Sequence, residues 1–241
     1  MKIKNPVKYF SRAEIWLWST SVAAIAVSFF VFGGRGYLTL CASLIGVTSL
    51  ILNAKGNPWG QVLMIAFSVM YGIISYGFSY YGEMLTYLGM TAPMALAALV
   101  SWLRHPSEHG RSEVRVNALR PAEYIGAFFL CIAVTAGFSV LLSYLGTTNI
   151  VISTVSVFTS FAAAYLTFRR SEFFAAAYAA NDIVLIVMWI LASLSDSSYI
   201  SVVICFAAFL ANDIYSFISW RSMRLRQSRS TAKNVCKEQN G

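Results

Sequence analysis

Two aspartates stand inside apolar stretches of the sequence, where a carboxylate has few polar neighbours. Asp182 lies in the segment AANDIVLIVMW and Asp213 in LANDIYSFISW, so the phrase Ala-Asn-Asp-Ile occurs twice, 31 residues apart. Asn181 and Asn212 place an amide beside each carboxylate. Trp189 follows Asp182 by seven residues, which puts both on one face of a helix. A carboxylate, an amide and an indole together can hold a ribose and a flat heterocycle.

The residues alone leave three other roles open for this pair. Asn and Asp side chains can link two helices by hydrogen bonds without any ligand. Two aspartates can share one proton as a protease dyad, although intramembrane aspartyl proteases carry a Gly-x-Gly-Asp pattern, whereas Ala precedes both Asn-Asp pairs here. Either Asp182 or Asp213 could also carry a proton in coupled transport.

The composition places the chain in a membrane. Of its 241 residues, 58% are hydrophobic and 12% are charged, whereas about 25% are charged in a soluble domain. Most of the length falls into apolar runs of about 18 residues or more, long enough to cross a bilayer as helices. The net charge of +8 is spread between and beside these runs. No compact basic domain remains to bind nucleic acid.

Neither a metal site nor a cofactor is indicated. The cysteines lack the paired spacing of a zinc site or a disulfide framework. His105 and His109 flank Pro106, which breaks the helix that would align them as ligands. No Gly-x-x-x-x-Gly-Lys-Ser/Thr loop occurs, which excludes direct drive by ATP.

Hydropathy predicts an all-α integral membrane protein with eight transmembrane helices. The predicted spans are 14–32, 37–54, 59–80, 84–103, 123–142, 148–168, 173–194 and 198–220. With a cytoplasmic N-terminus, every lysine and arginine except Arg35 falls on the cytoplasmic side. We therefore expect a multi-pass protein of the cytoplasmic membrane with both termini inside. The first span is expected to remain as a helix, because no small-residue cleavage site follows it.

This topology puts the two aspartates at similar depths. Spans seven and eight are antiparallel neighbours, so Asp182 lies about 14 Å and Asp213 about 10 Å from the cytoplasmic end at a rise of about 1.5 Å per residue. An ionisable residue in a span costs roughly 2.5–3.5 kcal/mol on insertion scales, so both should face protein or a water-filled cavity. In span four, Pro93 permits a kink.

An internal repeat is indicated by the ends of two spans. Span four ends in LVSWLRHP and span eight in FISWRSMR, so both carry Ser-Trp shortly before an arginine. Spans two to four and six to eight are predicted to be parallel repeats, with span five as the linker that restores the orientation. The basic tail is expected to be disordered beyond about Gln227. The expected units are 1–36 (N-terminal segment and first helix), 37–103 (first triple bundle), 104–142 (cytoplasmic loop and linker helix), 143–222 (second triple bundle) and 223–241 (basic tail).

Several segments resemble the PnuC family of bacterial vitamin-precursor transporters. They are NAKGNPWGQ, YGIISYGFSYYGEMLTYLGMTAPM and SWLR in the first half, and NDIVLIVMW and NDIYSFISW in the second. The likeness runs from about residue 37 to residue 222 and includes Tyr71, the YGEML motif and Trp102.

The resemblance implies a 3+1+3 bundle related to the SWEET sugar transporters, preceded by one extra helix. It implies a transporter and not an enzyme, which takes up nicotinamide riboside, an NAD precursor, by facilitated diffusion with alternating access. A cytoplasmic kinase would trap the product, and the protein would be a homo-oligomer, a trimer, in the lipid bilayer. Relatives carry thiamine, riboflavin or deoxynucleosides, so the family alone does not fix the substrate.

The candidate substrate-binding site combines the residue patterns with this resemblance. Nicotinamide riboside carries a fixed positive charge, which the carboxylate of Asp182 would favour. The ring face of Trp189 would favour it by about 0.5–2 kcal/mol through a cation–π contact. The candidate substrate-binding residues are Asn181, Asp182, Trp189, Asn212, Asp213, Tyr215, Gln61 and Tyr71.

Overall fold

The chain forms a bundle of long helices in the computed structural model, which describes residues 9–32, 36–77, 81–107, 112–147 and 149–239. Within these ranges, eight helical segments are long and apolar enough to cross a membrane, which confirms the predicted all-α membrane fold. The helices are α2 (Arg12–Val31), α3 (Tyr37–Ala54), α4 (Trp59–Gly77), α5 (Tyr81–Thr86), the π-helical turn η1 (Tyr87–Thr91), α6 (Ala92–Arg104), α7 (Pro121–Tyr144), α8 (Ile150–Phe168), α9 (Phe174–Ser193), the 3-10 turn η2 (Ser197–Tyr199) and α10 (Ile200–Gln239).

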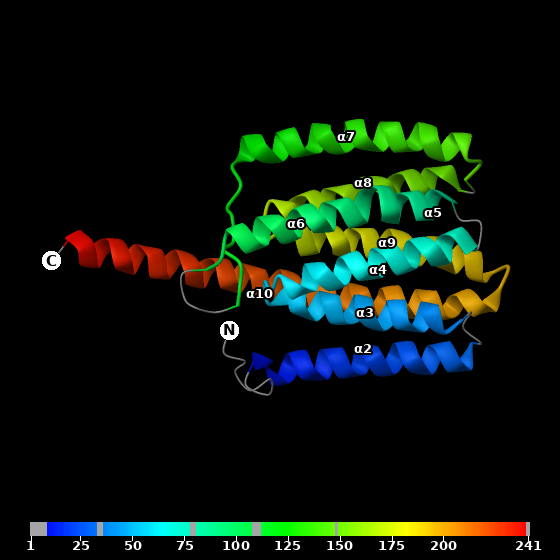
Figure 1. The fold of residues 1–241 in the computed structure, drawn as a ribbon, viewed down its shortest axis with the longest axis horizontal. Helices are drawn as coiled ribbons and strands as arrows, with labels where there is room; N and C mark the ends of the chain where they lie inside the picture. Colours follow the sequence, from blue (N-terminus) through cyan, green and yellow to red (C-terminus); the bar gives the residue numbers. More distant parts are fainter. Residues whose placement is uncertain (1–8, 33–35, 78–80, 108–111, 148, 240–241) are drawn as a thin grey trace.

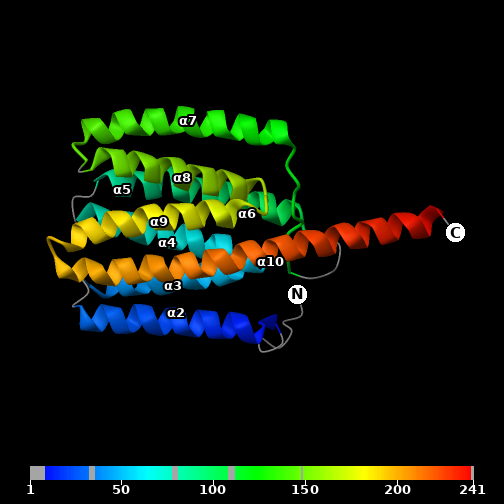
Figure 2. The same ribbon diagram turned by 180° about the vertical axis from the view of Figure 1, so that it is seen from behind.

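Two bundles of three spans lie one in front of the other in the view of Figure 1, and Figure 2 shows them from behind. The first consists of α3, α4 and the broken span α5–η1–α6, and the second of α8, α9 and α10. Between the bundles, α3 packs against α10 and α6 against α8, so the first helix of each bundle meets the third span of the other. On one flank α2 packs against α3 and α10, and on the opposite flank α7 packs against α8 (Figures 1 and 2).

The turns that follow the first helix of each bundle are copies of one another. Gly56 has φ +64° and Arg170 has φ +57°, so both adopt the left-handed conformation at equivalent positions. At the next residue, the side chains of Asn57 and Ser171 each accept a hydrogen bond from the backbone N–H two residues further on. The equivalence supports the predicted internal repeat.

The Ser-Trp pair of α6 binds the last turn of α8. Trp102 Nε1 donates to the carbonyl oxygen of Thr167 at 2.9 Å, and Ser101 Oγ donates to that of Phe168 at 2.9 Å. Helix ends carry carbonyl groups without intrahelical partners. The pair therefore satisfies the end of one bundle's first helix with side chains of the other bundle.

The Ser-Trp pair of α10 makes the same contacts with the last turn of α3. Trp220 Nε1 donates to the carbonyl oxygen of Asn53 at 2.8 Å, and Ser219 Oγ donates to that of Ala54 at 2.8 Å. The rings of Trp102 and Trp220 meet, with centroids 5.3 Å apart. We call these two sets of contacts the Ser–Trp clasps. They confirm the repeat and join the bundles at the predicted cytoplasmic end.

The loop between α6 and α7 crosses the same end of the bundle. The N–H of Val114 donates to the carbonyl of Gly56 at 2.9 Å, and the N–H of Asn117 donates to that of Arg170 at 2.9 Å. The loop therefore binds both of the repeated turns. Together with the clasps it covers a buried apolar cluster of Trp102, Val114, Phe174, Ala175 and Trp220.

The fourth span is interrupted, as the proline in its sequence permits. A π-helical turn over Tyr87–Thr91 separates α5 from α6, and Pro93 is at the start of α6. Proline has no N–H to donate to the carbonyl group one turn earlier, which weakens the α-helical pattern at this point. Thr91 Oγ1 donates to the carbonyl oxygen of Thr86 at 3.2 Å within this turn.

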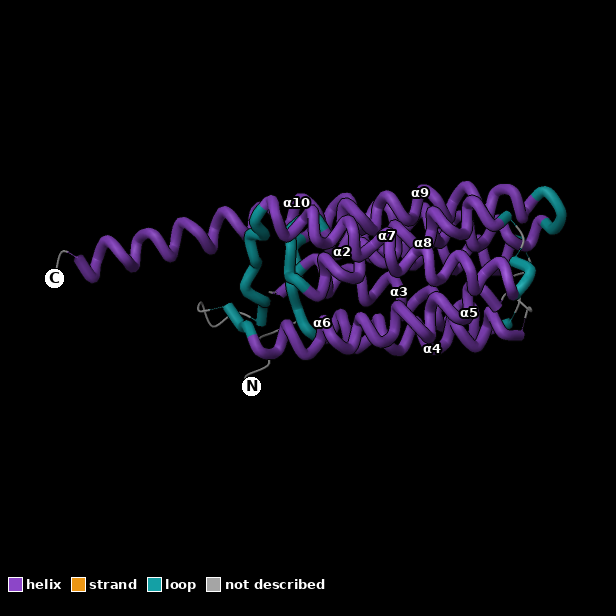
Figure 3. The backbone as a smooth tube through the Cα atoms, turned by 90° about the horizontal axis from the view of Figure 1, so that it is seen from above, coloured by secondary structure: helices purple, strands orange, loops and turns teal. Residues whose placement is uncertain are grey.

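The basic tail is helical, which corrects the expectation of disorder beyond Gln227. α10 continues to Gln239 and projects past the bundle (Figure 3). No glycine or proline occurs within α10, so the sequence offers no stop signal there. The emerging helix is held by Arg226, whose guanidinium lies 2.7 Å from the carboxylate of Glu113.

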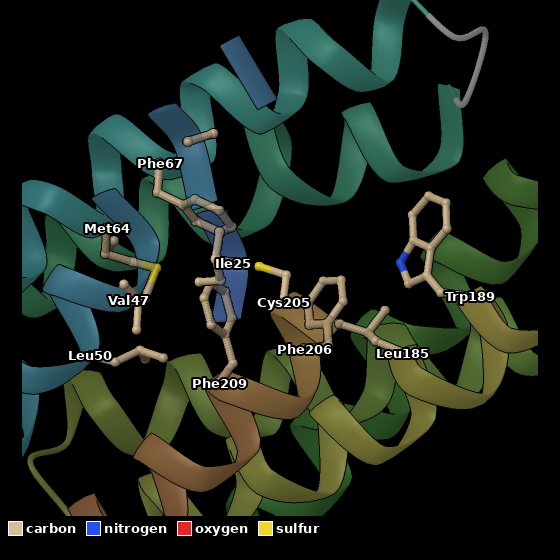
Figure 4. Close-up of a cluster of buried hydrophobic side chains, with 12 residues drawn as sticks. Ile25, Val47, Leu50, Met64, Phe67, Leu185, Trp189, Cys205, Phe206 and Phe209 are labelled. Atoms are coloured by element: carbon tan, nitrogen blue, oxygen red, sulfur yellow. The ribbon is translucent and has the colours of Figure 1, made fainter. Parts of the chain in front are cut away.

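The largest apolar cluster lies where α2, α3, α4, α9 and α10 meet (Figure 4). The rings of Phe67 and Phe209 pack edge to face with centroids 5.9 Å apart. Gly46 allows α3 to approach α10 closely, since a Cβ atom there would lie 2.6 Å from Phe209 Cζ. Trp189 lies at the edge of this cluster, toward the far end of the bundle from the clasps.

We expect Gly60→Ala to lower the free energy of unfolding by about 1–3 kcal/mol, as for overpacked cores. The added Cβ atom would lie 2.2 Å from Asn53 Oδ1, which accepts a hydrogen bond from Gln61 Nε2. The control is Gly126→Ala on α7, where no atom of the described residues lies within 4 Å of the new Cβ. Unfolding of the detergent-purified protein measures both, and equal effects would contradict this packing.

Candidate substrate-binding site

A cavity of about 480 Å³ lies between the two bundles, at the end opposite the Ser–Trp clasps. Buried residues such as Leu185 and Trp189 line its deep part, and exposed residues such as Leu145 and Ser195 form its rim. Its lining comes from α5 and η1 of the first bundle, from α8, α9 and η2 of the second, and from the end of α7 with the turn that follows it. Its volume is within the usual range for small-molecule sites, about 300–1,000 Å³.

Aromatic side chains from both bundles line the cavity. The ring centroids of Trp189 and Tyr199 are 5.2 Å apart, with the planes tilted by 40°. Tyr87 from η1 also lines the cavity and is supported from behind by Tyr71 of α4, with centroids 4.4 Å apart. Ring faces of this kind pack well against flat heterocycles.

Hydroxyl groups on α8 form a polar part of the lining. Ser156 and Ser160 line the cavity, and both donate to Asn181 Oδ1, at 3.5 and 2.8 Å. Thr159 Oγ1 donates to the same oxygen at 2.9 Å. Asn181 therefore lies behind the cavity wall and fixes the positions of the hydroxyl groups in it.

The charged groups of the lining are acidic. Glu83 of α5 and Asp196 of the turn before η2 line the cavity, and none of the described lining residues is Lys, Arg or His. Glu83 Oε2 is buried and has no hydrogen-bond partner among the described residues. Asp196 Oδ1 accepts a hydrogen bond from the N–H of Ser198 at 2.9 Å. A cavity lined by one sign of charge attracts ligands of the opposite sign, here cations.

The two predicted aspartates meet between α9 and α10, about one turn from the cavity. Their carboxyl groups are hydrogen-bonded to each other, and the side chains are only 4% (Asp182) and 2% (Asp213) exposed. A hydrogen bond between two carboxyl groups needs a proton, so the pair carries at most one negative charge. Neither residue lines the cavity.

Two further predicted residues face the first helix. Asn212 Nδ2 donates to Ser21 Oγ at 2.9 Å, and the hydroxyl of Tyr215 donates to Glu14 Oε1 at 3.0 Å. These contacts fasten α10 to α2.

The two predicted residues of the third span lie on α4. Gln61 Nε2 donates to Asn53 Oδ1 at 2.9 Å near the clasps, and Tyr71 packs behind Tyr87. Of the eight predicted residues, Trp189 lines the described cavity, and Asn181 and Tyr71 contact residues that do.

The sequence interpretation did not single out Glu83, Tyr199 or Asp196. Glu83 belongs to the YGEML motif, which contributed only to the family resemblance, and it lies just before the predicted start of the fourth span. An acidic residue at the edge of a span is usually solvated, so its type and position gave no signal. Its place in the cavity depends on how α5 packs against α4 and on how the following turn η1 packs against α8.

Comparison with known proteins identifies the family to which this chain belongs. Residues 36–222 match the model of a family described as nicotinamide mononucleotide transporter. The chain belongs to this family. The nicotinamide riboside transporter PnuC of Neisseria mucosa is 22% identical to it over 216 residues, which are 88% of this chain and 82% of that protein. The crystal structure of the vitamin B3 transporter PnuC shares its fold, with a TM-score of 0.79 and 21% identity over 90% of this chain and 94% of that chain.

Membership of the nicotinamide mononucleotide transporter family confirms the PnuC resemblance and the multi-pass membrane fold. The matching proteins are transporters and not enzymes, so the interpretation of Asp182 and Asp213 as a protease dyad is set aside. The two residues instead link α9 to α10.

We expect Asp213→Asn to change the free energy of unfolding by less than about 1 kcal/mol, since the amide oxygen can accept a hydrogen bond from protonated Asp182. Asp213→Leu leaves the Asp182 carboxyl group buried without this partner, which costs about 1–3 kcal/mol. Thermal unfolding in detergent separates the two. A variant with Asn as unstable as the one with Leu would show that the pair needs two carboxyl groups.

Proposed function

We propose that the protein takes up nicotinamide riboside across the cytoplasmic membrane. The cavity between the bundles carries this proposal. Trp189 and Tyr199 offer ring faces for a flat heterocycle, and Ser156 and Ser160 offer hydroxyl groups to a ribose. The acidic lining matches the fixed positive charge of the pyridinium ring. The name of the Neisseria mucosa relative refers to the same nucleoside.

The charge of the cavity favours the nucleoside over the mononucleotide that gives the family its name. A phosphate group adds a charge of about −1.5 to −2 at neutral pH. Phosphate-binding sites commonly pair this charge with arginine or lysine. Here the described lining has the carboxylates of Glu83 and Asp196 and no basic residue, so a phosphorylated substrate would be repelled.

Alternating access is the transport mechanism that the fold supports. The cavity is open at the end opposite the Ser–Trp clasps, and the clasps with the loop around Val114 close the other end. Passage of a substrate then requires the two bundles to separate at the clasps and to approach each other around the cavity. Rocking of one repeat against another is the usual motion of transporters built from repeats.

Uptake by this route is facilitated diffusion. A membrane potential favours inward movement of a cation by about 2.3 kcal/mol per 100 mV. Phosphorylation of the nucleoside by a cytoplasmic kinase would trap it inside and maintain the gradient. The proton shared by Asp182 and Asp213 lies outside the described cavity lining, which favours uniport over coupling to that proton.

Calorimetry on the detergent-purified protein tests the substrate directly. We expect nicotinamide riboside to bind, and thiamine, riboflavin, deoxyuridine and nicotinamide mononucleotide to bind at least about tenfold more weakly. Trp189→Ala should weaken binding about tenfold, because it removes stacking and a cation–π contact of about 0.5–2 kcal/mol. The control Trp16→Ala changes an exposed tryptophan on α2, away from the cavity, and should leave binding unchanged. Tighter binding of one of the rivals would reassign the substrate.

The Ser–Trp clasps should control how often the cytoplasmic end opens. Trp102→Phe and Trp220→Phe each keep a ring but lose one N–H donor worth about 0.5–1.5 kcal/mol. In a background without native cysteines, Val114→Cys reports opening through its reaction with a thiol reagent, because Val114 is fully buried. We expect each phenylalanine variant to speed labelling by about 2- to 10-fold.

A tryptophan that makes no clasp provides the control for this labelling. Trp59→Phe, at an exposed position near the same end of the bundle, should leave the labelling rate unchanged. If neither clasp variant changed the rate, the clasps would not be the contacts that hold this end closed.

A further inference from the structure

We propose, on the basis of the proposed function, that Glu83 determines the preference for a positively charged nucleoside. Its carboxylate would face the pyridinium ring while that ring lies against Trp189. The recognition of charge would then belong to α5 of the first bundle, and the recognition of the flat ring to α9 of the second.

The surroundings of Glu83 are those of a carboxylate without its counter-charge. The residue lines the cavity, and its Oε2 atom is buried with no hydrogen-bond partner among the described residues. A buried polar atom without a partner is costly, and more so when the group is charged. A cation in the cavity would supply a counter-charge for the carboxylate, which a neutral ligand of the same shape could not do.

The other acidic residues of this region either lie outside the cavity or accept a hydrogen bond. Asp182 and Asp213 are hydrogen-bonded to each other, and although Asp182 Oδ2 and Asp213 Oδ1 are also buried without a partner among the described residues, neither residue lines the cavity. Asp196 does line it, at the rim, where its carboxylate accepts the N–H of Ser198 and so caps η2. Glu83 is therefore the acidic residue of the described lining whose carboxylate has a buried oxygen without a hydrogen-bond partner among the described residues.

Tyr87 is the neighbour that would hold the Glu83 carboxylate in position relative to the pyridinium ring. It follows Glu83 by one helical turn, lines the cavity beside it, and is packed against Tyr71 and Phe67 with centroids 4.4 and 5.9 Å apart. This packing fixes the π-helical turn that follows α5. A substrate held between Glu83 and Trp189 would contact both bundles, so that binding favours their approach at this end.

A pair of ligands that differ in charge and share their shape tests the role of Glu83. Nicotinamide riboside carries the pyridinium cation, and dihydronicotinamide riboside has the same ribose and amide on an uncharged dihydropyridine ring. Calorimetry with wild-type protein, Glu83→Gln, Glu83→Asp and Asp196→Asn measures the affinity for both. We expect Glu83→Gln to weaken binding of the cation about 10- to 100-fold, as for loss of a charged partner.

The same variant should bind the neutral ligand about as well as the wild type does, which also shows that it is folded. Glu83→Asp keeps the charge and should keep the preference for the cation. Asp196→Asn is the matched control, since it removes the other carboxylate of the lining, and it should change the ratio of the two affinities much less than Glu83→Gln does, because Asp196 lies at the rim and accepts the N–H of Ser198.

Two results would overturn the role of Glu83. If Glu83→Gln weakened the binding of both ligands by the same factor, the residue would shape the cavity without determining the preference for a charged ligand. If Asp196→Asn abolished the preference for the cation and Glu83→Gln did not, Asp196 at the rim would be the residue that determines this preference. A wild-type protein that binds neither ligand would overturn the proposed function itself, and with it the role assigned to Glu83.

Discussion

The hydrogen bonds of the two Ser–Trp clasps are the interaction on which the rest of the structure depends. Each tryptophan donates to a carbonyl oxygen at the end of a helix in the other bundle, which also accepts a backbone N–H of the following turn, and each serine donates to the last carbonyl oxygen of that helix. The clasps thus satisfy polar groups and join the bundles in the same step. Because Trp102 and Trp220 also meet each other, the joint is closed at this end, and the space between the bundles is open at the other.

The polar residues inside the bundle divide into two groups with different partners. One group fastens helices together, as the carboxyl pair of Asp182 and Asp213 does for α9 and α10 and as Asn212 does for α10 and α2. The other group lines the cavity, where Glu83 and Ser160 face space that a ligand can fill. Hydrocarbon offers no hydrogen bonds, so every buried polar group needs one of these two kinds of partner.

The sequence predicts the spans and the repeat because these depend on local composition and on spacing along one helix. It also includes Trp189, which lines the cavity, among the candidate residues. It does not predict which polar residues face the cavity, since that depends on how each helix is rotated against its neighbours. Asn212 and Asp213 are adjacent, yet one contacts α2 and the other α9. Glu83 had no signal at the edge of its span. The helical tail is consistent with the absence of glycine and proline from α10, which the expectation of disorder, based on the basic charge of the tail, did not weigh.

A structure determined with nicotinamide riboside bound would test the central claim most directly, namely that the substrate site is the cavity opposite the clasps. We expect the pyridinium ring to lie between Trp189 and Glu83, with the ribose near Ser156 and Ser160 and with no contact to Asp182. A nucleoside found instead at the carboxyl pair between α9 and α10, or outside the cavity, would contradict this claim.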